Sequence, residues 1–193
     1  YESRDEYAAA SGEAVMELIR KNIRARDVVT RKSLENAATV VAATGGSTNA
    51  GLHLPAIASE AGIDFDLLDV CEIFRKTPYI ADLKPGGRYV AKDLYEAGGV
   101  GIVIKALLDG GYMHEDCLTV TGKTLGENYG GVEFPTGQDV VRPIDNPLSP
   151  TGGVVGLTGN LAPQGAIVKV AGLARVQFRG PARVFEREED CLQ

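Results

Sequence analysis

The stretch Thr44-Gly45-Gly46-Ser47-Thr48-Asn49-Ala50 separates two apolar, alanine-rich runs that both have the spacing of helices. It predicts a loop that leads into a second helix, with Ser47, Thr48 or Asn49 as the N-cap. The first backbone N–H groups of such a helix have no partner within it, and they form the positive end of the helix dipole. Together with two hydroxyl groups, these donors predict a site for a carboxylate or a phosphate. A plain connection between two helices is the alternative interpretation.

The composition is that of a globular protein with an acidic balance. The 193 residues are 44% hydrophobic and 24% charged, and the formal net charge is -6. A chain of this length can bury one sizeable core or two small ones. The acidic excess, without any run rich in lysine and arginine, argues against a nucleic acid as the main partner. The sequence shows no signal peptide and no apolar run of membrane-spanning length, so we expect a soluble, cytoplasmic protein without a membrane partner.

Three cysteines, Cys71, Cys117 and Cys191, lie far apart in the sequence. Their odd number and wide spacing predict reduced thiols and not a disulfide framework. No Cys-x-x-Cys pair occurs, so neighbouring thiols cannot assemble a zinc site or an iron–sulfur cluster. We therefore expect buried cysteines with a structural role.

Capping residues and apolar spacing predict a series of helices in the first half of the chain. The spacing of Ser3 and Glu6 predicts a capping box, and Gly62 is well placed as a left-handed C-cap. His53 is interpreted as a structural hydrogen-bonding residue, because no acid lies near it in sequence. The expected helices cover residues 3–21, 30–43 with Thr30 or Ser33 as its cap, 49–61, 67–75 capped by Asp66, 89–97 and 100–108, the last of which could equally be a buried strand.

The segment Leu118–Thr121 alternates like a strand and leads into Gly122-Lys123-Thr124, which precedes a short helix over 125–128. A phosphate-binding P-loop needs a glycine five residues before its Gly-Lys pair, and Cys117 stands at that place. A nucleotide site is therefore rejected. Lys123 is kept as a second candidate contact for an anionic substrate, and a salt-bridged surface lysine is the favoured alternative.

The sequence changes character after the first two thirds of the chain. A proline-rich segment with few apolar side chains covers 131–150 and predicts an extended crossing between two domains. Beyond it, short apolar runs separated by glycine and proline predict strands. These strands cover 154–157, 166–170, 175–178 and 182–185, with a turn at Asn160–Pro163 and the start of a helix over 186–190.

Four motifs in this order resemble the dihydroxy-acid dehydratase and phosphogluconate dehydratase family, which also includes sugar-acid dehydratases. The resemblance covers nearly the whole chain. The motifs are Gly45-Gly46-Ser47-Thr48-Asn49-Ala50, Arg75-Lys76-Thr77-Pro78 with Ala81-Asp82-Leu83-Lys84-Pro85-Gly86-Gly87, Asp116-Cys117-Leu118-Thr119-Val120-Thr121-Gly122-Lys123-Thr124, and Gly159-Asn160-Leu161-Ala162-Pro163.

The resemblance implies an enzyme that uses an iron–sulfur cluster and magnesium to remove water from a 2,3-dihydroxy acid, giving a 2-keto acid for branched-chain amino-acid synthesis. It also implies a homodimer. The implied fold is α/β, with a mainly helical C-terminal portion of an α/β domain over residues 1–130, the crossing over 131–150, and the opening strands of a β-barrel-like domain over 151–193. Both ends of the chain look cut, so we expect a fragment.

The chain departs from the family pattern in the groups that carry the chemistry. The cluster-binding cysteine motifs and the magnesium-binding carbamylated lysine lie upstream in the family, and the Thr-Asp-Gly-Arg-x-Ser-Gly segment with the catalytic serine lies downstream. We therefore expect no catalytic residue, no metal ligand and no bound cofactor in this chain. The resemblance leaves Ser47, Thr48, Asn49 and Lys123 as candidate substrate-binding residues. An aldonate or phosphogluconate dehydratase, or a non-catalytic anion-binding module, is the alternative.

Overall fold

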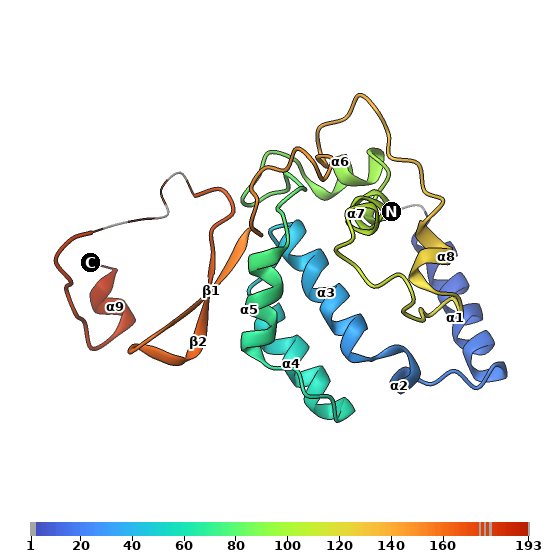
Figure 1. Cartoon of the computed structure of the whole chain (residues 1–193), viewed down its shortest axis with the longest axis horizontal. Helices are drawn as coiled ribbons and strands as arrows, with labels where there is room; N and C mark the ends of the chain where they lie inside the picture. The colour runs from blue at the N-terminus through green and yellow to red at the C-terminus, as the bar shows by residue number, and fades with distance from the viewer. Residues whose placement is uncertain (1–2, 174, 176, 178, 193) are drawn as a thin grey trace.

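A computed structural model describes residues 3–173, 175, 177 and 179–192. It consists of a helical part and a β-hairpin that projects from one side of it (Figure 1). The predicted α/β class is confirmed, and the β part is an open two-stranded antiparallel sheet and not a closed barrel. The elements are α1 (Arg4–Arg20), α2 (Ala25–Val28), α3 (Arg31–Ala43), α4 (Ala50–Ala61), α5 (Leu67–Lys76), α6 (Ala91–Glu96), α7 (Val100–Asp109), α8 (Leu125–Tyr129), β1 (Val154–Gly159), β2 (Ala162–Lys169) and α9 (Glu188–Cys191).

Local capping signals set the ends of the central helices as the sequence predicts. The Thr30 hydroxyl accepts the N–H of Ser33 at 3.2 Å, so Thr30 is the cap of α3. The carboxylate of Asp66 accepts two N–H groups at the start of α5. Gly62 closes α4 in the left-handed conformation with φ 74°. These ends depend only on neighbouring residues, which is why the sequence predicts them.

Helix α7 packs into the first of two hydrophobic cores. The continuous apolar run over 100–104 is helical, which rules out the alternative of a buried strand. Ile102, Val103 and Leu107 are at most 1% exposed, and they contact the extended segments around Ile80 and Val141. Val140 and Val141 belong to the segment predicted to cross between domains, so this part of the crossing packs into the helical core.

The second core joins α3, α4 and α5 to the hairpin. Phe74 and Val70 of α5 and Ala42 of α3 are fully buried, and Val154 of β1 packs among them with 0% exposure. Figure 1 shows the hairpin beside α5, on the side away from α7. The hairpin is therefore anchored to the helical part by the first residue of β1.

Several sequence predictions are wrong. Leu118–Thr121 is not a strand, because Leu118 makes only one isolated bridge, to Thr124 across a tight turn. Residues 182–185 form no strand and are mostly exposed. The predicted strand over 175–178 includes positions outside the described residues. Strand β2 begins at Ala162, so the turn of the hairpin is shorter than Asn160–Pro163.

Helix α1 begins next to Ser3 as predicted, but the Ser3 side chain makes no capping hydrogen bond. None of its residues is buried, and Tyr7, Val15 and Ile19 are each more than half exposed. The predicted short helices over 125–128 and near 186–190 are found as α8 and α9. None of the helices in the described ranges has the length and apolarity needed to cross a membrane.

Candidate functional site

The loop between α3 and α4 presents three polar side chains to solvent. Ser47, Thr48 and Asn49 are all exposed, and the Ser47 hydroxyl accepts the N–H of Asn49 at 3.2 Å. The sequence predicts free N–H groups at the first residues of α4, and this detail is wrong. A tight turn precedes the helix, so Ala50 and Gly51 donate to the carbonyls of Ser47 and Thr48.

The free donors lie one turn earlier than predicted. The N–H groups of Ser47 and Thr48 have no hydrogen-bond partner among the described residues. They are the first donors of the helical array, so they take the positive end of its dipole. Two free N–H groups, two exposed hydroxyls and one exposed amide thus lie within three consecutive residues. Such a donor set suits a carboxylate.

Four chain segments converge at the base of this loop. Gly45 has φ 57°, and a Cβ at this position would lie 3.0 Å from Ala171 Cβ and 3.0 Å from the ring of Tyr79. A Cβ on Gly153 would lie 2.7 Å from the Cα of Gly45, and one on Gly86 would lie 2.8 Å from Ala171 Cβ. The backbones meet too closely for side chains at these glycines. The loop is therefore held against the hairpin region, and the same region contacts the 82–89 segment through Ala171.

Backbone hydrogen bonds fix the same junction. The carbonyl of Ala43 accepts the N–H groups of Ile80 and Ala81 at 2.9 and 3.0 Å. The N–H of Gly153 donates to Ala42 at 3.1 Å, and the carbonyl of Gly153 accepts from Ala171 at 2.9 Å. Because the last turn of α3 is bonded on two sides, the loop that follows starts from a rigid base.

Tyr79 lies inside this junction. Its side chain is 7% exposed, and burial raises the pKa of its phenol. The hydroxyl has no hydrogen-bond partner among the described residues. The edge of the ring that carries it packs against Gly45. A buried hydroxyl without a partner costs folding free energy.

Replacing Tyr79 by phenylalanine is expected to raise the free energy of unfolding by about 1 kcal/mol, because the variant no longer buries an unpaired hydroxyl. Urea unfolding of the chain measures this difference. Tyr89→Phe is the matched control: its hydroxyl donates to Asp139, so its loss should destabilise the chain. A destabilised Tyr79→Phe variant would mean that the Tyr79 hydroxyl does have a partner.

The 82–89 segment is closed by a network that the sequence does not reveal. Arg88 Nε donates to the carboxylate of Asp82, which is 7% exposed, and Arg88 also donates to Asp139 Oδ2 at 2.9 Å. The hydrogen bond from Tyr89 and then that from Arg88 lower the pKa of Asp139. In the sequence, Asp82 stands out only as part of the motif Ala81–Gly87, and nothing there points to its ion pair with Arg88.

Lys123 lies away from the loop. A Cβ on its neighbour Gly122 would lie 3.5 Å from Ile23 and from Lys21 at the end of α1. Asp116 of the same segment pairs at 2.5 Å with Lys32 in the first turn of α3, whereas Ser47 follows the last turn of α3. Thirteen residues of helix separate the two ends, which corresponds to roughly 20 Å. Lys123 and Ser47 therefore cannot contact the same small acid in this conformation.

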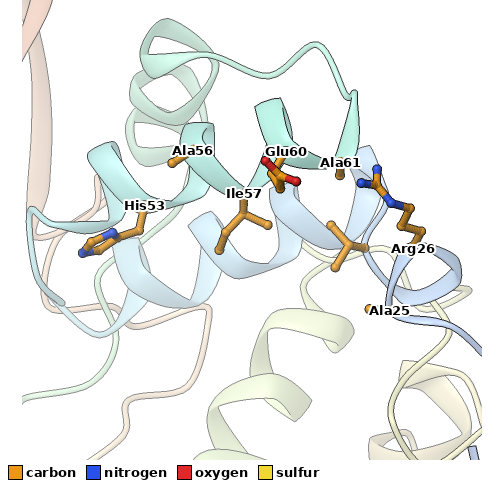
Figure 2. A pocket seen from close by; sticks show the side chains of 8 residues that line it. Ala25, Arg26, His53, Ala56, Ile57, Glu60 and Ala61 are labelled. Atoms are coloured by element: carbon orange, nitrogen blue, oxygen red, sulfur yellow. The ribbon is translucent and has the colours of Figure 1, made fainter.

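A separate groove of about 540 Å³ lies between α2 and α4 (Figure 2). His53 lies at one end of it, Arg26 at the other, and Ile57 between them. The prediction that His53 is a structural hydrogen-bonding residue is wrong, since its exposed ring makes no hydrogen bond to a described residue. The walls are mostly aliphatic and the polar groups do not converge, so this groove fits a dihydroxy acid poorly.

Two family models match the chain. The model described as dihydroxy-acid/6-phosphogluconate dehydratase N-terminal matches residues 1–128, which is more than half of the sequence. The chain belongs to the dihydroxy-acid/6-phosphogluconate dehydratase family. The C-terminal model of the same family matches residues 139–193.

Three curated relatives that match the whole chain are all named dihydroxy-acid dehydratases. The chain is 70% identical to a dihydroxy-acid dehydratase of Parvibaculum lavamentivorans, over 100% of this chain and 34% of the relative. It is 67% identical to dihydroxy-acid dehydratase 2 of Mesorhizobium japonicum and 65% identical to dihydroxy-acid dehydratase 2 of Bradyrhizobium diazoefficiens, which it covers to 33% and 34%. The chain thus spans about a third of the length of these relatives.

The residues of this dehydratase segment do not fit the metal groups that the family resemblance implies. Within the described ranges, no three His, Cys, Asp or Glu side chains gather in a group that could hold a metal ion. Cys71 packs against Gly156 and Cys117 is buried, and burial raises the pKa of both thiols. Cys71 is half-buried and Cys191 is exposed, so the expectation of buried cysteines is correct for Cys117 alone. We therefore derive no catalytic step through a cluster or a magnesium ion here.

Proposed function

We propose that the full-length polypeptide is a dihydroxy-acid dehydratase, a hydro-lyase that converts a 2,3-dihydroxy acid to a 2-keto acid in branched-chain amino-acid synthesis. The observation that carries this proposal is the 65–70% identity to three relatives of that name over the whole chain. An aldonate or phosphogluconate dehydratase is the second candidate, because the family description includes 6-phosphogluconate dehydratase.

The proposal includes the cofactors, partners and location of the full-length enzyme. An iron–sulfur cluster and magnesium supply Lewis-acid chemistry to enzymes of this kind, and we propose that chain outside this segment holds both groups. We also propose a cytoplasmic homodimer that takes a small dihydroxy acid and binds neither nucleic acid nor membrane. The acidic net charge of -6 supports the absence of a nucleic-acid partner.

The proposed domain division places the first domain at 1–130, a crossing at 131–150 and the second domain at 151–193. The boundary between the matches of the two family models, at 128 and 139, supports a division in this region. We propose that the active site lies between the two domains. The loop 44–49 is suited to such a site, because its base contacts Gly153 and Ala171 of the hairpin region.

We propose that Ser47, Thr48 and Asn49 bind the substrate carboxylate. The argument rests on the two unpaired N–H groups and the exposed hydroxyls in the turn that precedes α4, and on the rigid junction below them. A carboxylate at this place gains charge-assisted hydrogen bonds and a favourable interaction with the helix dipole. Lys123 remains a separate prediction that this carboxylate site does not use.

The test is a full-length enzyme in which this chain replaces the matching third of the Parvibaculum relative. A branched aliphatic 2,3-dihydroxy acid should be dehydrated much faster than a sugar acid such as gluconate; the reverse preference would favour the second candidate. The double variant Ser47→Ala and Thr48→Ala should raise KM about 10-fold, the loss expected when hydrogen bonds to a charged group are removed. Ser59→Ala is the control, because Ser59 is an exposed serine near the other end of α4. Equal kinetics of the double variant and the control would reject the carboxylate site.

A further inference from the structure

One face of the hairpin packs on the helices, and it carries a lysine. Residues that stand opposite each other in an antiparallel pair share a face of the sheet, and the register pairs Val154 with Lys169 and Gly156 with Ile167. Val154 is fully buried in the second core. Lys169 stands opposite Val154, so it belongs to the face that lies on the helices.

Lys169 lies between two contacts that this face makes with the ends of the loop before α4. On one side, a Cβ on Gly51 in the first turn of α4 would overlap the Cδ1 of Ile167. On the other side, Ala171, just after the end of β2, packs its Cβ against Gly45. Side chains two residues apart along a strand lie on the same face, so Lys169 follows Ile167 on this face. Its side chain therefore faces the part of the chain that connects Gly45 to Gly51, which is the loop with the candidate carboxylate-binding residues.

The ammonium group of Lys169 has no partner among the described residues. The residue is half-buried, and its side chain makes no hydrogen bond or ion pair within the described ranges. No Asp or Glu occurs in residues 36–59, which contain the loop, or in residues 146–185, which contain the hairpin. Of the acids in neighbouring segments, Asp82 is bound by an arginine, and Asp66 accepts two N–H groups of α5. An anion beside the loop is therefore attracted by a positive charge that no carboxylate of these two stretches neutralises.

We propose that Lys169 is a further substrate-binding residue, whose ammonium group pairs with the carboxylate that the loop before α4 binds. The loop supplies neutral donors, namely two free N–H groups and two hydroxyls, whereas Lys169 supplies a full positive charge. The loop precedes the proposed crossing at 131–150 and Lys169 follows it, so a carboxylate held by both joins the two proposed domains. This inference rests on the carboxylate site given under the proposed function.

Binding of an acid and of its uncharged amide separates this role from a structural one. In the full-length enzyme described above, Lys169→Met keeps the aliphatic stem of the side chain and removes its charge. The affinity for the branched 2-keto acid, measured by calorimetry, should fall about 10-fold, while the affinity for the carboxamide of the same compound should stay unchanged. Lys92→Met is the matched control, because the Lys92 side chain is 79% exposed on α6. It should leave both affinities as they are in the unsubstituted enzyme.

An equal loss of affinity for the acid and the amide, or no loss for either, would overturn the proposal. A Lys169→Met enzyme that unfolds more easily but keeps its preference for the acid would also overturn it, because the partner of Lys169 would then be a carboxylate of the polypeptide. Should this variant fail to fold, Lys169→Gln also removes the charge and gives the same comparison.

The same measurement separates a failure of this inference from a failure of the proposed function. Gluconate and gluconamide are measured as a second pair, so the result does not depend on which acid the enzyme dehydrates. If only the role of Lys169 is wrong, the double variant Ser47→Ala and Thr48→Ala loses affinity for the acid and Lys169→Met does not. If the carboxylate site itself is wrong, neither variant changes the preference for the acid over the amide.

Discussion

Replacing Gly156 by valine is expected to lower the free energy of unfolding of the chain by about 3 kcal/mol, among the larger costs of overpacking. A Cβ at Gly156 would overlap the Sγ and Cβ of Cys71 in α5. The cysteine side chain is too short to move out of the way, so the strand has to move away from the helix. Val154, two residues before it, would then lose its place in the second core.

Urea unfolding measures this loss, and Gly159→Val is the matched control. Gly159 lies in the same strand, and a Cβ there would meet no atom within 4 Å. It should therefore cost less than about 1 kcal/mol. A Cys71→Gly substitution in the Gly156→Val background should restore part of the lost free energy, since it removes the overlapping atoms. Equal effects at Gly156 and Gly159 would show that the contact with Cys71 does not limit this position.

The elements that the sequence predicts well depend on neighbouring residues. The Thr30 and Asp66 caps and the Gly62 C-cap each involve at most a few consecutive positions, and all three are confirmed. The strand predicted at Leu118–Thr121 is wrong, because a strand depends on more than its neighbouring residues. Its alternation resembles a strand, yet a strand needs a partner, and the chain turns back on itself at Gly122 with φ 76°.

The candidate site could be predicted only in part. The polar loop at Ser47 follows from the sequence, because glycine and alanine patterns mark both of its sides. The position of its free N–H groups does not, since it depends on whether a tight turn precedes the helix. The contacts below the loop join Gly45 to Gly153 and Ala171. Such contacts between distant segments leave no periodic pattern in the sequence.

The second large effect concerns Arg88. Replacing it by methionine is expected to lower the free energy of unfolding by more than the loss of an exposed ion pair does, because the carboxylate of Asp82 is then buried without its charged partner. Asp82 is 7% exposed and lies at the start of the segment that touches the loop junction. Methionine keeps the aliphatic stem of the side chain, so the change reports mainly on the lost charge.

Arg75→Met provides the comparison in the same protein. Arg75 pairs with Glu72, and both side chains are largely exposed, at 67% and 47%. Breaking an ion pair of this kind should change the free energy of unfolding little, since water solvates either charge once the pair is broken. The double variant Asp82→Asn and Arg88→Met should recover part of the stability, because an uncharged amide is less costly to bury than a lone carboxylate. Equal losses for Arg88→Met and Arg75→Met would show that burial of Asp82 does not control this interaction, and that water reaches the carboxylate in solution.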